Sequence, residues 1–206
     1  KGETLLLAAG SASFQGEVYS PGGFVEVSGV RHLDFRGKVD TDKTGVLLLD
    51  PNDITITSLG VTNPSPLTPN YDGSPVVAST ILNTDLTALL ATNSVTIQTS
   101  SSVAGGNGDI TVEFGAPVSW MSGTNLTLHA ANSIFINDLI QANTSPSVVT
   151  LVADLGDIVI VSTDFGPTAA GVEINGSYPG AGSNAVIVSV PNGALSLTSA
   201  IDSRAY

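Results

Sequence analysis

A short sequence near the start of the chain recurs at a fixed distance. Residues 14–18 read Phe-Gln-Gly-Glu-Val, and residues 35–39 read Phe-Arg-Gly-Lys-Val, 21 positions later. Farther along, short apolar segments begin at Ile110, Ile134 and Ile158, in two steps of 24 residues. A period of about 20 to 24 residues is typical of a chain that winds into stacked coils, in which equivalent strands pair in parallel.

Two more series of apolar residues have nearly the same spacing, and we expect each to form a ladder of stacked side chains. They are, with steps of 23, Leu126, Val149, Val172 and Leu195, and, with steps of 20 and 22, Leu5, Val25 and Leu47. Apolar residues alternate with Thr and Ser around them, and a sustained helical period is nearly absent. The sequence therefore predicts an all-β parallel β-helix, a solenoid with coils of about 20 to 24 residues. An antiparallel sandwich is the alternative, because short strands separated by turns occur in both folds.

The period is interrupted once, over residues 59–93. Residues 60–75 contain four prolines, which exclude a central strand. Residues 84–91 carry an apolar stripe after Thr84, a possible N-cap, so they predict one short helix. We expect coils over residues 1–58 and 94–206, with an extruded loop and short helix between them, all in one solenoid domain. The insert would cover an open side or present a binding surface.

Acidic residues dominate the charge. The chain has 18 acidic and 6 basic side chains, a net charge of −12, and no basic residue between positions 44 and 203. Nucleic acids and anionic membranes are therefore poor partners, because both need clustered Lys and Arg. The carboxylates of residues 44–203 have no cation within that stretch, so we expect them to be solvated or to form turns.

Residue patterns for catalysis or metal binding are incomplete. The chain has no Cys and two histidines, His32 and His129, which lie in different coils, so a zinc site would need carboxylates to complete it. Residues 83–85 read Asn-Thr-Asp, one short motif of polygalacturonases, but the other motifs of those enzymes are missing. The mixed charges of residues 31–42 are expected to form exposed pairs between adjacent coils. We expect no enzymatic activity, no metal and no cofactor.

Several segments cover most of residues 22–140: residues 22–29, 35–41, 45–56, 86–97, 108–112, Trp120 and 126–137. Together they resemble filamentous haemagglutinin-like exoproteins. The resemblance implies a right-handed β-helical shaft used in adhesion. It also implies a secreted protein of the bacterial cell surface, exported through an outer-membrane partner transporter by two-partner secretion. The family's secretion domain carries Asn-Pro motifs, and the only Asn-Pro here is Asn63-Pro64, so we expect a later shaft segment.

These observations predict a structural and adhesive segment that acts as a rigid shaft with contacts made by its loops. Its partners would be a host or neighbouring cell surface, with glycans as possible ligands, because aromatic side chains in loops can stack on sugars. One alternative is a filament subunit that associates end to end through an open strand edge. Another is a carbohydrate-active β-helix that binds or cleaves a polysaccharide. The residues expected to contact a ligand are Asn70, Tyr71, Asp72, Trp120 and Tyr178.

Overall fold

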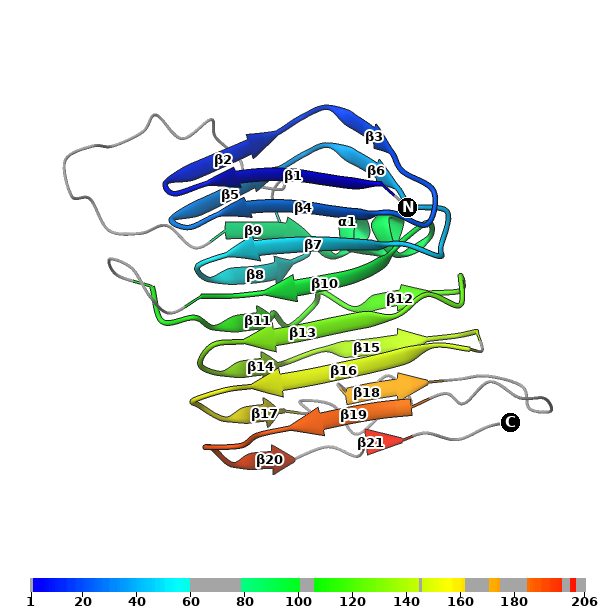
Figure 1. Cartoon of the computed structure of the whole chain (residues 1–206). Coiled ribbons are helices and arrows are strands. Elements are labelled where there is room, and N and C mark those ends of the chain that lie inside the picture. Colours follow the sequence, from blue (N-terminus) through cyan, green and yellow to red (C-terminus); the bar gives the residue numbers. More distant parts are fainter. Residues whose placement is uncertain are drawn as a thin grey trace.

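The computed structural model describes residues 2–59, 79–100, 106–144, 146–161, 171–174, 185–197 and 201–202 (Figure 1). The described part is mostly β-strand, with one short helix, and all of its strand pairs are parallel. The first sheet has seven strands, in the order β1 (Glu3–Ala8), β4 (Phe24–Gly29), β7 (Val46–Pro51), β10 (Ser94–Gln98), β13 (Leu126–Ala130), β16 (Val148–Ala153) and β19 (Ala185–Ser189).

Two further sheets and two strand pairs complete the described fold. The second sheet runs in the order β20 (Leu195–Leu197), β17 (Ile158–Ile160), β14 (Ile134–Ile136), β11 (Ile110–Val112), β8 (Ile54–Thr57) and β9 (Ser79–Leu82). The third sheet runs in the order β12 (Val118–Trp120), β15 (Leu139–Ala142), β18 (Gly171–Ile174) and β21 (Ile201–Asp202). The pairs are β2 (Ser11–Phe14) with β5 (His32–Phe35), and β3 (Glu17–Tyr19) with β6 (Lys38–Asp40).

The order of the strands shows that the chain returns to the first sheet after visiting the other two sides. We call a strand of the first sheet, together with the elements that follow it on the other two sides, a layer. The described strands form seven layers, because the first sheet has seven strands. The layers are stacked from β1 at the top of Figure 1 to β20 and β21 at the bottom. Because parallel neighbours lie about 4.8 Å apart, equivalent residues of successive layers come into contact.

An apolar ladder fills the space between the sheets. In the first sheet, Val95 pairs with Leu126, and Leu126 pairs with Val149, and all three side chains are buried. Ile110, Ile134 and Ile158 form a matching buried ladder in the second sheet, so the two steps of 24 residues are confirmed as strand pairings. Since alternate residues of a strand point to opposite faces, the residues between them point outward. On the first sheet they form a column that contains Thr96, Thr127 and Thr150.

The other two series are partly wrong. Val149 pairs with Val186, whereas Val172 pairs with Ile140 in the third sheet and Leu195 with Ile158 in the second. The equal steps of 23 residues thus join strands from three different sides. Every side of a layer has the same apolar alternation, so the spacing alone cannot tell one side from another.

The series near the start of the chain is wrong by one residue. Val25 pairs with Leu47 as expected, but its partner in β1 is Thr4, and Leu5 pairs with Glu26. A shift of one residue turns a side chain to the other face of the strand, so Leu5 points outward. The repeat of Phe14 and Phe35, in contrast, is confirmed as a pairing of β2 with β5.

The third layer departs from the others on two sides. After β8, the chain continues through residues 60–78, which lie outside the described residues, and then adds β9 to the second sheet beside β8. The Leu33 amide of β5 donates to Ser79 Oγ of β9 at 2.9 Å, so β9 lies between β5 and β8. The chain therefore rejoins the stack at Ser79, through a strand, and not first through the expected helix.

The predicted short helix is confirmed as α1 (Asn83–Leu90), which contacts β6 and β12 and so takes the place of a strand on the third side. The expected cap at Thr84 is wrong, because Leu82 is the N-cap and no side chain caps that end. The last carbonyls of the helix do have partners. Asn93 Nδ2 donates to Leu89 O at 2.8 Å, and the hydroxyl of Thr124 donates to Leu90 O at 2.6 Å. These bonds join the helix to β10 and to the turn before β13.

Candidate functional site

Four of the five residues expected to contact a ligand lie outside the described residues: Asn70, Tyr71, Asp72 and Tyr178. The fifth, Trp120 of β12, is 3% exposed and belongs to the hydrophobic core. Its indole N–H donates to Thr124 O at 3.0 Å. The structure therefore places Trp120 in the core, where its ring presents no face to a sugar.

Carboxylates at the corner between the first and second sheets bind backbone amides of the next layer. Asp53 Oδ1 accepts hydrogen bonds from the amides of Gly108 and Asp109, at 2.7 and 2.8 Å. Asp109 Oδ1 accepts from Ser133 N at 3.0 Å, and Asp157 Oδ1 from Ala194 N at 2.7 Å. The expectation that the acids of this basic-free stretch form turns is confirmed for these three residues. Their role is to cap the stacked turns.

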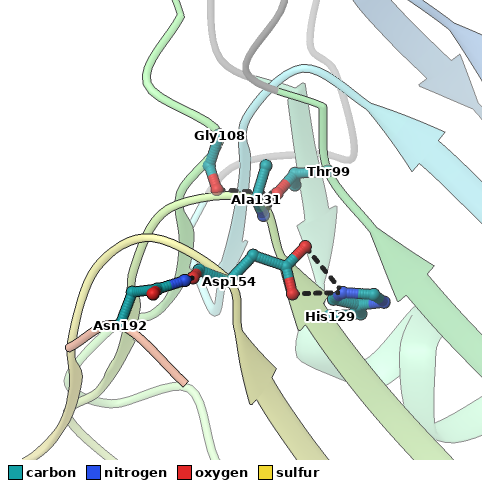
Figure 2. A network of polar contacts seen from close by, with 6 residues as sticks. All are labelled: Thr99, Gly108, His129, Ala131, Asp154 and Asn192. Atoms are coloured by element: carbon teal, nitrogen blue, oxygen red, sulfur yellow. Dashed lines mark hydrogen bonds and ion pairs between the residues drawn. The ribbon is translucent and has the colours of Figure 1, made fainter. Parts of the chain in front are cut away.

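A second polar network lies where β13 and β16 end (Figure 2). His129 Nε2 and Asp154 Oδ2 are 3.0 Å apart, and their side chains are 34% and 50% exposed. Asn192 Nδ2 donates to the backbone oxygen of Asp154 at 2.7 Å. The nearby Thr99 contacts His129 through its backbone, since its N–H donates to His129 O at 3.0 Å. Its hydroxyl donates to Gly108 O at 2.7 Å and accepts from Ala131 N at 3.1 Å. This network lacks the hydroxyl–imidazole contact that an activated nucleophile requires.

The residues that could bind a metal are dispersed. His32 lies on β5 and His129 on β13, which belongs to a different sheet. Among the described residues, no three His, Asp or Glu side chains are grouped closely enough to hold a metal ion.

The part of the chain that the structure describes contains no helix with the length and hydropathy of a transmembrane span.

One charged pair of the segment 31–42 is well defined. Arg36 Nε lies 2.7 Å from Asp34 Oδ1, and Ser13 Oγ donates to Asp34 Oδ2 at 3.2 Å. The Asp34 side chain is buried, whereas Arg36 is exposed. The ion pair joins residues of the same layer, and the bond from Ser13 is the one that links two layers. For Asp34, the link between coils is therefore made by a hydroxyl and not by a cation, whereas Lys38 of β6 lies beside Glu17 of β3 in the adjacent layer.

Asp50 on the outward face of the first sheet has a perturbed acidity. Burial, and secondarily the neighbouring charge of Glu26, raise the pKa of Asp50 to about 6. Its Oδ1 atom is buried and has no hydrogen-bond partner among the described residues. Burial of a carboxylate without donors disfavours the ionised form. The ionised form of Asp50 is therefore less favourable in the folded chain than in the unfolded chain.

A feature with the shape of a binding site lies on the third side, beside α1. It is a pocket of about 620 Å³. One wall is the chain from the end of β5 into β6, and the other wall is α1 with its flanking residues. The lining residues are Phe35, Arg36, Gly37, Lys38, Val39, Leu82, Asp85, Ala88, Leu89 and Thr92.

Sequence reasoning missed this pocket although it identified both walls. The repeat Phe-Arg-Gly-Lys-Val marked residues 35–39, and the apolar stripe marked the helix. What the sequence did not show is that the helix takes the place of a strand next to β6.

Comparison with protein-family models, with curated proteins and with solved structures found no match in any of the three.

Proposed function

We propose that this chain is a structural, non-enzymatic segment of a secreted bacterial surface protein, a rigid shaft that carries adhesive loops. Its fold is a right-handed parallel β-helix of the kind implied by the resemblance to filamentous haemagglutinin-like exoproteins. The observation that carries this proposal is the unbroken ladder of the first sheet. Seven parallel strands keep one column of inward apolar residues in register through every layer: Leu6, Val27, Leu49, Ile97, Leu128, Leu151 and Val188.

The ladder supports a mechanical role because it couples each layer to its neighbours by two independent means. Backbone hydrogen bonds run along the stack, and buried side chains such as Leu49, Ile97 and Leu128 are stacked in the same direction. Since each layer contacts mainly its neighbours, the resistance to bending is distributed along the whole stack. The carboxylate caps at Asp53 and Asp109 add a third link at one corner.

The rigidity can be measured as a distance distribution. The chain has no Cys, so spin labels would attach only to two introduced cysteines, Gln15→Cys in the first layer and Leu155→Cys in the sixth. Both positions are exposed, so the labels can be attached without disturbing the core. Pulsed electron paramagnetic resonance should give one narrow distance distribution. A broad or double distribution would contradict the rigid shaft.

The non-enzymatic and adhesive parts of the proposal need separate tests. Incubation with a panel of acidic and neutral polysaccharides should release no new chain ends, and turnover of any of them would favour the carbohydrate-active alternative. For adhesion, the protein should bind a glycan array, and replacing residues 60–78 by a short Gly-Ser linker should abolish that binding. The replacement must end before Ser79, because β9 is part of the second sheet. Equal binding by both proteins would exclude this segment as the contact surface.

A second candidate, a filament subunit that associates end to end, is favoured by exposed apolar residues on β1. This strand lies at the edge of the first sheet, where Leu5 is 49% and Leu7 is 59% exposed. An edge strand with unpaired backbone groups can pair with another chain. Sedimentation at rising protein concentration tests this candidate by measuring the particle mass. A mass that increases for the wild type, and does not increase for Leu6→Pro, would support the filament subunit. A constant mass for the wild type would exclude it.

A further inference from the structure

The pocket beside α1 has a geometric origin. A strand takes up about 4.8 Å of the stack, whereas an α-helix with its side chains is about 10 Å wide. On the third side, α1 lies between β6 and β12, where the neighbouring layers place a strand. In the first sheet β4, β7 and β10 pair directly, so that side is not widened. The helix therefore stands away from residues 35–39, and the space between them is the pocket.

The lining combines an apolar floor with a charged rim. The apolar members are Phe35, Val39, Leu82, Ala88 and Leu89. Phe35 is fixed by stacking on Phe14, with ring centroids 5.4 Å apart, so this part of the floor is rigid. Ala88 is exposed although it lies in the helix, since it faces the open space and not the core. A volume of about 620 Å³ lies within the range of roughly 300–1,000 Å³ that is usual for small-molecule sites.

The charges on the rim select the kind of ligand. Lys38 is exposed and forms no ion pair among the described residues, although Glu17 is its neighbour in the pairing of β3 with β6. Arg36 also lines the pocket, where its Nε is bound to Asp34. Two of the six basic residues of an otherwise acidic chain thus lie at one apolar pocket. Asp85 lines the α1 wall, so an anion is favoured toward Lys38 and disfavoured beside the helix.

We propose that this pocket binds a small amphipathic anion, with an aliphatic or aromatic body over Leu82, Ala88 and Leu89 and a carboxylate, sulfate or phosphate group at Lys38. The body removes apolar surface from water, which supplies the larger part of the affinity. The head group forms a charge-assisted hydrogen bond with the ammonium, which orients the ligand. This inference does not depend on the shaft being an adhesin.

The test uses the full chain with decanoate, decyl sulfate and neutral decanol as probes, followed by calorimetry and by NMR of the Leu82, Ala88 and Leu89 signals. We expect one equivalent of each anion to bind saturably, with shifts at these three residues, and decanol to bind at least tenfold more weakly. Lys38→Gln should weaken anion binding about tenfold. Arg31→Gln removes the same charge from an exposed residue outside the pocket and should change binding less than twofold.

Ala88→Glu provides an independent check, because it fills the pocket and adds a negative charge at an exposed helix position where folding is not at risk. It should abolish binding of both anions while the circular dichroism spectrum is unchanged. The proposal is overturned if no probe binds, if decanol binds as tightly as decanoate, or if Lys38→Gln and Arg31→Gln have equal effects. Shifts confined to residues away from the pocket would also overturn it.

Discussion

Replacing Asp50 by Asn should stabilise the folded chain at neutral pH. The pKa of Asp50 is raised from 3.8 to about 6, first by burial and second by Glu26. The folded chain therefore holds this proton more tightly than the unfolded chain. The resulting stabilisation is present in full below about pH 4 and is lost as the pH rises through about 6.

The magnitude follows from the difference between the two pKa values. Each pKa unit corresponds to about 1.4 kcal/mol, so a difference of about 2.2 gives an upper bound of about 3 kcal/mol. The carboxyl group is only half-buried, and solvent screening reduces this to roughly 1–1.5 kcal/mol. Asn has nearly the same shape and no charge. At pH 7.5 the free energy of unfolding of Asp50→Asn should exceed that of the wild type by that amount.

Two measurements check this reasoning. Urea unfolding at pH 4 to 8 should show the two proteins converging at the acid end and separating between pH 4 and 7. The ¹³Cγ chemical shift of Asp50 should titrate near pH 6, and Glu26→Gln should lower that pKa by less than half of its rise, because burial is the larger cause. Glu113→Gln, at an exposed position, controls for the loss of one negative charge. A titration midpoint near 3.8, or an equal stability difference at pH 4 and pH 7.5, would refute the argument.

Three further substitutions test the contacts that hold the layers together. Asp53→Ala removes the acceptor of the Gly108 and Asp109 amides, so it should lower the free energy of unfolding in urea by roughly 1.5–3 kcal/mol. Hydrogen exchange at those two amides should become faster. Unchanged exchange would contradict the capping role of Asp53. Leu128→Ala leaves a cavity between Ile97 and Leu151 and should lower the free energy of unfolding by about 2–5 kcal/mol. A decrease below about 1 kcal/mol would mean that the ladder is loosely packed. Gly45→Ala would place its Cβ against the Gly23 carbonyl oxygen, so it should destabilise by about 1–3 kcal/mol. Gly10→Ala meets no atom within 4 Å, and it should change the unfolding free energy by less than the Gly45 variant; the opposite order would be inconsistent with close approach of the layers.

The sequence predicted those parts of the fold that repeat and failed where the repeat is interrupted. Phe14 and Phe35 pair as their identical contexts indicated, and Ile110, Ile134 and Ile158 pair as their equal spacing indicated. Val172 and Leu195 were assigned to the wrong side, because apolar alternation marks a strand without marking its sheet. Register is set by backbone pairing across layers, which a single strand's sequence does not contain.

The candidate site was harder to predict for a related reason. Residues 35–39 and the helix lie about 45 positions apart in the sequence, and their proximity depends on β9 entering the second sheet before the helix begins. No local sequence pattern predicts the extra strand β9, which has only four residues. Trp120 shows the opposite error: its type suggested a contact residue, but its place in the core was decided by packing against neighbouring elements.

The register of the first sheet has a practical consequence for engineering. Val25 and Leu47 are 22 positions apart, whereas Leu47 and its next partner Val95 are 48 positions apart, yet all three keep the same inward alignment. The stack thus tolerates a large change in the length of chain between two paired strands, provided that the chain leaves after one strand and returns in register to the next. The interval between Leu59 and Ser79 is therefore a natural graft point. A foreign peptide placed there should be accepted if it brings the chain back in register at β9.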